Sequence, residues 1–218
     1  MSTQPAADLY RIAFTDLRCL ETTDDQGSAH DEPYALFFVV DLQGDLPQLN
    51  LFRTRVFQGV DEDAPENNPK QHVRFWGTNG QAAAITHPDK VIVLVALMEN
   101  DDSDIGHIMA FSLAVLTMTV TAIALNHDSH ATRVAKLKTA FRSAIDLGAI
   151  TTKVFDSDDD RIGDIEELVI HRSDLERAKK TGTLVHKSLV FAYPDADKDG
   201  ERDDQGKYRL DFEIAAGA

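Results

Sequence analysis

Two short apolar stretches decide the fold class, Ala35-Leu-Phe-Phe-Val-Val40 and Val91-Ile-Val-Leu-Val95. Their β-branched and aromatic side chains are the types that a pleated, buried strand surface selects. Acidic or Gly/Pro/Asn-containing loops separate the segments of this kind, which are Leu9–Leu20, Tyr34–Leu42, Leu49–Val60, Val73–Trp76, Val91–Met98, Glu167–His171, Ser188–Tyr193 and Tyr208–Ile214. About eight such strands predict a mainly β protein, an antiparallel β-sandwich rather than a set of alternating βαβ units.

One region departs from the strand pattern. Residues 108–125 include no charged side chain, and apolar residues recur at helical spacing over residues 131–147. We interpret these segments as two helices, with Asp128 or Ser129 as the N-cap of the second and Gly148 as its stop. The prediction is a single domain over 1–218, with a β-sandwich over 8–104 and 150–216 and a helical hairpin inserted over 107–148.

A third, short helix is predicted to begin at Ser173 and to end at Gly182. Ser173 and Glu176 have the spacing of a capping box, in which a hydroxyl and a carboxylate satisfy the first free backbone N–H groups of a helix.

The uncharged helix 108–125 raises the question of membrane insertion. At 1.5 Å per residue it is about 27 Å long, slightly short of a bilayer core of about 30 Å. Its large apolar residues form two opposite seams, Leu113, Leu116, Val120 and Ile123 on one side and Phe111, Met118 and Leu125 on the other. Two seams favour burial against the sheet or in a homo-oligomer interface, and insertion by a toxin-like protein is the lesser alternative.

The charge balance excludes one class of partner. With 22 Lys and Arg against 37 Asp and Glu, the net charge is −15, and a surface of this kind does not bind nucleic acid phosphates. The single cysteine, Cys19, excludes an intrachain disulfide and lies in an apolar strand-like run, where a buried, unreactive thiol is expected. Because the first ten residues have no secretory signal pattern, the expected location is cytoplasmic, or exported without a cleavable N-terminal signal.

Acidic residues concentrate in the loops between the predicted strands. Calcium takes six to eight oxygen ligands, so a site needs several carboxylates brought together from loops. The candidate metal ligands are Asp31, Glu99, Asp101, Asp102, Asp156, Asp158, Asp159, Asp160, Asp195, Asp197 and Asp199. Strand connections in a sandwich cluster at its two ends, so several of these loops can meet at one rim and hold calcium.

The stretch Val154-Phe-Asp-Ser-Asp-Asp-Asp-Arg-Ile-Gly163 resembles the aspartate-rich loop of the calcium- and phospholipid-binding β-sandwich domains of the synaptotagmin type. The resemblance implies Asp156, Asp158 and Asp160 as calcium ligands and Ile162-Gly163 as the turn into the next strand. It also implies calcium-dependent contact with a membrane or protein surface. A similar stretch, Glu99-Asn-Asp-Asp-Ser-Asp-Ile-Gly106, could supply Glu99, Asp101 and Asp102. The family has no helical hairpin between its strands, which suggests that the hairpin was inserted between an acidic loop and its Ile-Gly exit.

Other interpretations of the acidic loops remain open. Residues 156–167 match several positions of a helix-loop-helix calcium loop, but Arg161 replaces its required glycine, and residues 195–206 lack its final carboxylate. Every acidic loop is also compatible with a solvated turn.

The histidines and the remaining motifs add little to this list. The pair His127 and His130 lacks a third metal ligand and fits a capping or surface role better. No motif for phosphate binding, serine hydrolysis or zinc proteolysis is present in the sequence, so we expect a protein that is not an enzyme.

The sequence therefore predicts a calcium-binding β-sandwich module that acts by binding. The alternative is a structural or oligomerising protein whose acidic loops are only solvated turns.

Overall fold

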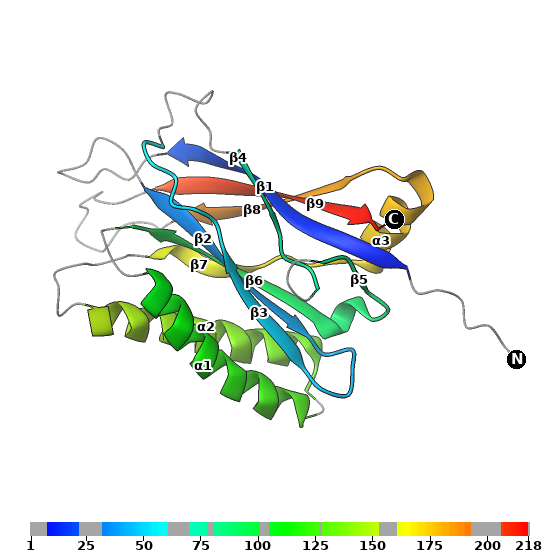
Figure 1. The fold of residues 1–218 in the computed structure, drawn as a ribbon, viewed down its shortest axis with the longest axis horizontal. Coiled ribbons are helices and arrows are strands. Elements are labelled where there is room, and N and C mark those ends of the chain that lie inside the picture. The colour runs from blue at the N-terminus through cyan, green and yellow to red at the C-terminus, as the bar shows by residue number, and fades with distance from the viewer. Residues whose placement is uncertain are drawn as a thin grey trace, which may run out of the picture.

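The computed structural model describes residues 8–21, 32–60, 70–77, 81–100, 105–126, 128–152, 161–192 and 206–217. These residues form two antiparallel sheets and three α-helices (Figure 1). The first sheet has the order β4-β1-β9-β8, with β5 paired to β1, and the second has the order β3-β2-β6-β7. The strands are β1 (Leu9–Glu21), β2 (Pro33–Asp41), β3 (Gln48–Arg53), β4 (Lys70–Arg74), β5 (Ala83–Ala84), β6 (Val91–Glu99), β7 (Arg161–Glu167), β8 (Val185–Ala192) and β9 (Lys207–Ala216). The predicted mainly β sandwich is confirmed.

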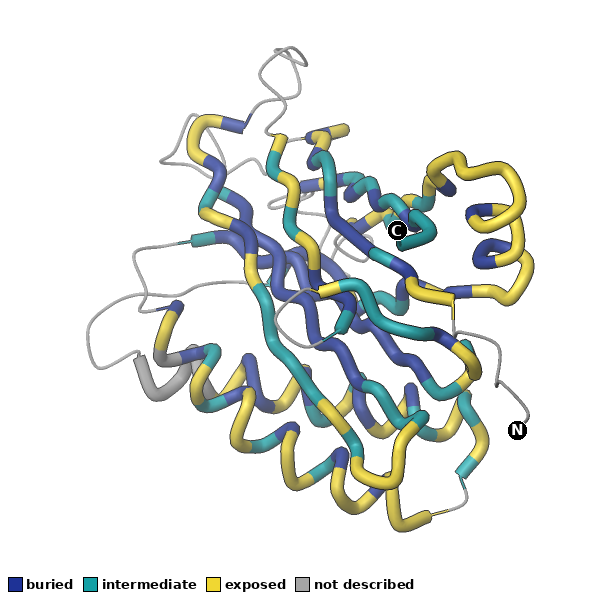
Figure 2. The backbone as a smooth tube through the Cα atoms, turned by 45° about the vertical axis from the view of Figure 1, so that its right-hand side comes forward, coloured by how far each residue is buried: buried dark blue, intermediate teal, exposed yellow. Residues whose placement is uncertain are grey.

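The apolar core between the sheets is rich in aromatic side chains. Phe14 and Phe212 from the first sheet meet Phe37 from the second, with ring centroids 5.7–6.1 Å apart. Phe37 also stacks on Phe75 at 5.1 Å. Every residue of β6 and all but the last of β2 are buried, because the second sheet is covered on both faces (Figure 2). Their uninterrupted apolar sequence reflects this double burial.

The helical hairpin is inserted between β6 and β7, which are neighbours in the second sheet. Helices α1 (Ile105–Ala124) and α2 (His130–Thr152) follow β6 in the chain and precede β7 (Figure 1). They cover the outer face of this sheet, where Leu116 and Val120 of α1 and Leu137 and Phe141 of α2 pack against β2 and β6. The predicted helical insertion in the sandwich is thus present, and its helices extend over residues 105–152, where the sequence predicted 107–148.

The boundaries of several elements differ from the prediction. β7 covers residues 161–167 rather than 167–171, and Gly163, expected in a turn before the strand, lies at a bulge within it with φ of 70°. Gly148 does not stop α2. Glycine is tolerated inside a helix at a cost of about 1 kcal/mol, and the packing of α2 on the sheet offsets such a cost.

The two smaller helix-start predictions have different outcomes. The side-chain oxygen of Ser129 accepts the backbone N–H of Thr132, so the N-cap prediction for α2 is confirmed. Helix α3 (Arg172–Thr181) begins one residue before Ser173, and its capping carboxylate is Asp174 rather than Glu176. Its end is as predicted, with Gly182 in the left-handed conformation.

Candidate functional site

Strand register gathers six strand ends at one end of the sandwich, which we call the acidic end and define by Glu21, Pro33, Glu99, Arg161, Ala192 and Lys207. In the second sheet, Pro33 lies opposite Glu99, and Met98 lies opposite Arg161. In the first sheet, Lys207 lies opposite both Glu21 and Ala192. All these strand ends lie at the left in Figure 1.

The two sheets also meet at the acidic end. A Cβ atom built on Gly163 of β7 would lie 2.7 Å from the backbone oxygen of Ala192 of β8, so the two strands approach too closely for any larger residue. The strand ends of both sheets are therefore within one compact region, and the connections that leave them start from neighbouring points.

Four acidic segments join the elements at this end: 22–31 between β1 and β2, 101–104 between β6 and α1, 153–160 between α2 and β7, and 193–205 between β8 and β9. They contain sixteen of the 37 acidic residues, in groups of three, three, four and six, and only three of the 22 Lys and Arg. Carboxylates that come close together repel one another, and a hard cation with many oxygen ligands relieves such repulsion.

Of the predicted calcium ligands, Glu99 belongs to the described part of the chain. It ends β6, has 7% exposure and lies opposite Pro33, so a carboxylate is buried at the base of the acidic end. The other ten, Asp31, Asp101, Asp102, Asp156, Asp158, Asp159, Asp160, Asp195, Asp197 and Asp199, lie outside the described residues. Among the described residues alone, no cluster of three or more metal-ligating side chains is found.

The elements around the acidic segments weaken the helix-loop-helix interpretations. Segment 153–160 follows a helix but leads into strand β7, and segment 193–205 connects the antiparallel pair β8 and β9. The two similar acidic stretches also lead into different structures, because Ile105-Gly106 begins helix α1 whereas Ile162-Gly163 lies in β7.

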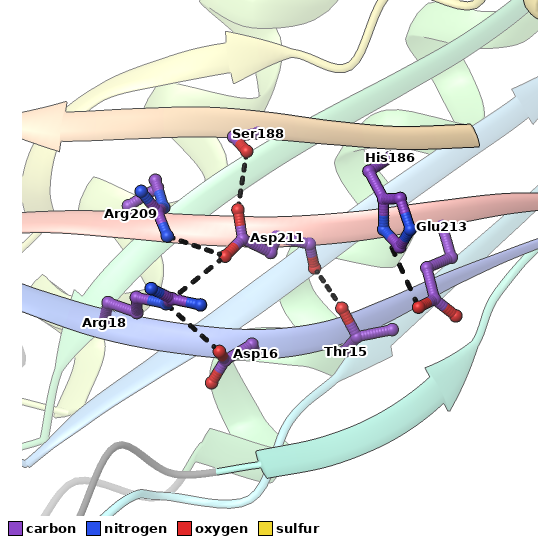
Figure 3. Close-up of polar contacts among 8 residues, drawn as sticks. All are labelled: Thr15, Asp16, Arg18, His186, Ser188, Arg209, Asp211 and Glu213. Carbon is purple, nitrogen blue, oxygen red and sulfur yellow. Dashed lines mark hydrogen bonds and ion pairs between the residues drawn. The ribbon is translucent and has the colours of Figure 1, made fainter. Parts of the chain in front are cut away.

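A second polar cluster lies on the outer face of the first sheet (Figure 3). Asp211 of β9 accepts hydrogen bonds from the Ser188 hydroxyl at 2.5 Å and from the Arg209 guanidinium at 3.2 Å. Nε of Arg18 lies 3.2 Å from the Asp16 carboxylate and 3.6 Å from that of Asp211. Because guanidinium groups already neutralise both carboxylates, this cluster is a poor cation site.

The same face brings a serine and a histidine onto β8, but not as a catalytic pair. Ser188 is hydrogen-bonded to Asp211, whereas His186 faces Glu213 at 3.8 Å (Figure 3). The two residues thus belong to separate pairs in the described structure, and the geometry for proton transfer from the serine to the histidine is not formed.

A cavity of about 390 Å³ lies beside the start of α2 and is lined in part by His130, Glu167 and Arg172. Nδ1 of His130 lies 2.7 Å from the backbone oxygen of Asp89, and Nε2 lies 2.7 Å from Oε1 of Glu167. Both neighbours are hydrogen-bond acceptors, and each ring nitrogen lies within hydrogen-bond distance of one of them. Because both nitrogens are engaged in these contacts, neither is free to bind a metal or act as a general base. The contact of His130 with Glu167 connects the start of α2 to β7.

The sequence did not predict the contacts of His130 or those of Asp211, because both depend on partners distant in the chain. Alternation of polar and apolar residues along β9 was the available signal for an outward-facing Asp211. The sequence placed His130 next to the N-cap of α2, but it did not predict the contacts of its ring with Asp89 and Glu167.

Comparisons of this chain with protein-family models, curated proteins and solved structures find no match. In the described part of the chain, no helix combines the length and the apolar character needed to cross a membrane.

Proposed function

We propose that this protein is a calcium-binding β-sandwich module that acts by binding a membrane or protein surface through its acidic end. The observation that supports the proposal is the register of the strands, because it gathers the flanking ends of four acidic segments. The synaptotagmin-type sequence resemblance of residues 154–163 supports the same chemistry. The surface partner is the calcium-bridged one that this resemblance implies.

The cation has a defined electrostatic role in this proposal. With a net charge of −15, the protein is repelled by an anionic surface until bound cations reverse the local charge. Carboxylates from segments 101–104, 153–160 and 193–205, together with Glu99, would provide the oxygen ligands, and an anionic partner would complete the coordination. Calcium would thus act both as a stabilising ion and as the bridge to the partner.

The first test is thermal unfolding in chelator and in a calcium series, with magnesium as the comparison ion. Calcium at a hundredfold over its dissociation constant adds about 2.7 kcal/mol by mass action. For a chain of this length we expect Tm to rise by about 5–10 °C. A Tm that calcium and magnesium leave unchanged would contradict the proposal.

Charge-neutralising variants test whether the calcium-dependent rise in Tm comes from the acidic segments. Asp156→Asn combined with Asp158→Asn should abolish or strongly reduce the calcium-dependent rise in Tm. The matched control is Asp45→Asn combined with Asp89→Asn, since both residues are exposed and flank the opposite end of β2 and β6. The control must keep the full calcium response, and an equal loss in both double variants would show a nonspecific charge effect.

The partner is tested by sedimentation with vesicles. Calcium should bring the protein down with vesicles containing phosphatidylserine but leave it in solution with phosphatidylcholine alone. Calcium binding without vesicle binding would direct the search to a protein partner. If the acidic loops are solvated turns, neither assay will respond to calcium.

A further inference from the structure

The outer face of α1 is uncharged along the whole helix. Leu116, Val120 and Ile123 point into the core beneath α1, while Met118 is 69% exposed on the other side and Leu125, just after the helix, is 80% exposed. The remaining residues of the outer face are small or apolar: Ala110, Leu113, Ala114, Thr117, Thr121 and Ala122. Of the predicted second seam, Met118 and Leu125 are exposed and Phe111 is half-buried, while Leu113, predicted in the inner seam, is exposed on the outer face. Figure 2 shows the outer side of both helices as exposed.

A groove of about 480 Å³ runs between the C-terminal half of α1 and α2. Ala122, Ile123, Ala135, Thr139 and Ala140 make up most of its lining. Three charged side chains of α2 form ion pairs within the chain: Lys136 with Asp128 at 2.7 Å, Lys138 with Glu166 at 3.6 Å, and Arg142 with Asp164 at 2.5 Å. The groove and the α1 face together form one surface. Few of the described charged side chains on this surface lack an ion-pair partner within the chain.

We propose that this surface joins two copies of the chain, with α1 packed antiparallel to α1 of the second copy across a twofold axis near Thr117. In this arrangement, the half of α1 that lines the groove faces the opposite half of the second α1, which presents Leu113. The groove of each copy thus receives an apolar side chain of the other, as an isologous interface requires. This proposal uses residues outside the acidic end and does not depend on calcium.

Charge explains why the helices are antiparallel. Helix α1 begins just after β6 leaves the acidic end and finishes near the opposite end, where α2 begins beside Asp89. Antiparallel packing therefore places the acidic ends of the two copies at opposite ends of the dimer and opposes the two helix dipoles. Parallel packing would place the acidic ends side by side.

The size of the surface is sufficient for a dimer. The groove extends the α1 face to the near side of α2, so with 20 residues in α1, a rise of 1.5 Å and about 10 Å for each helix, the surface measures about 30 by 20 Å at most, or up to about 600 Å² for each copy. The total of up to about 1,200 Å² is at the lower limit for stable, specific interfaces.

The test is sedimentation equilibrium of the full chain with and without chelator. We expect a mass of twice 24.1 kDa in both conditions. Met118→Glu places a charge in the interface and should halve the mass, while circular dichroism remains unchanged. Val190→Glu is the matched control, because Val190 is 49% exposed on β8, in the other sheet, and this variant should stay dimeric.

Oxidative cross-linking tests the arrangement. Thr117→Cys lies near the axis and should form a disulfide-linked dimer, whereas Leu125→Cys should not, since the two copies of residue 125 are far apart in an antiparallel pair. The chain without an added cysteine is the blank, because Cys19 is buried. Cross-linking at position 125 alone would overturn the antiparallel geometry. A wild-type chain that sediments as a monomer would overturn the dimer, and vesicle binding that Met118→Glu abolishes would then assign the face to lipid.

Discussion

Asp174 combines three roles at the start of α3. Its Oδ2 accepts hydrogen bonds from the backbone N–H of His171 at 3.1 Å and from Lys187 at 2.6 Å, and its Oδ1 accepts one from Arg177 at 3.0 Å. Burial alone raises the pKa of Asp174, but the hydrogen bond from Lys187, the backbone hydrogen bond and the nearby positive charges together outweigh burial and lower it. The carboxylate is therefore better stabilised in the folded than in the unfolded chain.

Asp174→Asn should reveal this contribution through its dependence on pH. The side chain is only 8% exposed, so losing the charge leaves Lys187 partly buried without its partner, at a cost of about 3 kcal/mol at pH 7. Because the folded pKa is lowered, the contribution is present above the unfolded pKa of about 3.9 and is lost as pH falls through the folded value. Urea unfolding between pH 7 and pH 2 should therefore show the difference between variant and wild type shrinking only below about pH 4.

Glu176→Gln is the control for this prediction. Glu176 is exposed on the same helix and is the residue that the sequence pattern identified as the capping carboxylate. It should have little effect on the free energy of unfolding at any pH. An effect equal to that of Asp174→Asn would contradict the assigned cap.

Gly163 is required both by its backbone conformation and by its surroundings. Its φ of 70° is strained for other residues, and an added Cβ would lie 2.7 Å from the oxygen of Ala192. We expect Gly163→Ala to lower the free energy of unfolding by about 2–4 kcal/mol, from strain and the clash together. Gly182→Ala has a similar φ of 63° but nothing within 4 Å, so chemical denaturation should show a loss of only about 1 kcal/mol. Equal losses would mean that the approach of β7 to β8 is unimportant.

At the scale of elements, the hairpin depends on the inner side of α2. Phe141 is fully buried, and its ring lies 5.6 Å from that of Phe38 on β2. Phe141→Ala should cost about 3–5 kcal/mol in denaturant unfolding, because it removes a large side chain between helix and sheet. Leu147→Ala, on the same helix but 47% exposed, should change stability by less than about 1 kcal/mol. A small effect at Phe141 would show that the hairpin contributes little to the stability of the sandwich.

Local sequence patterns predicted which segments form strands and helices better than they predicted what those segments pack against. The continuous apolar stretches of β2 and β6 and the spacing of Leu137 and Phe141 reflect burial that each segment needs by itself, so they could be identified. The start of β7 was missed because Arg161, Gly163 and Asp164 look like a turn when the neighbouring β8 is unknown. The apolar seams of α1 could be predicted, but only the structure shows that Leu116, Val120 and Ile123 are internal and that Leu113 and Met118 are exposed.

The candidate site depends on pairing between distant strands. The sequence located the acidic segments and suggested that they meet at one rim, but the register of β1 with β9 and of β2 with β6 is a long-range property. It brings Glu21, Glu99 and Arg161 to one end of the sandwich. That the loops hold calcium remains a prediction.

At the scale of the whole molecule, charge is distributed unevenly, and this predicts a dependence on salt. Sixteen acidic residues in four segments start from one end of the sandwich, so in chelator their repulsion opposes folding. Raising NaCl from about 0.01 M to about 1 M shortens the Debye length from about 30 Å to about 3 Å and screens this repulsion. Tm in chelator should therefore rise with salt.

Saturating calcium should make this salt-dependent rise smaller, because bound cations already neutralise the carboxylates. Asp156→Asn combined with Asp158→Asn should likewise reduce the rise in chelator, whereas Asp45→Asn combined with Asp89→Asn should not, since those two residues lie at the other end. Differential scanning calorimetry at matched ionic strengths measures all four cases. The same salt response with and without calcium would mean that calcium does not neutralise the acidic end, and the segments would then be solvated turns whose charges act only through long-range repulsion.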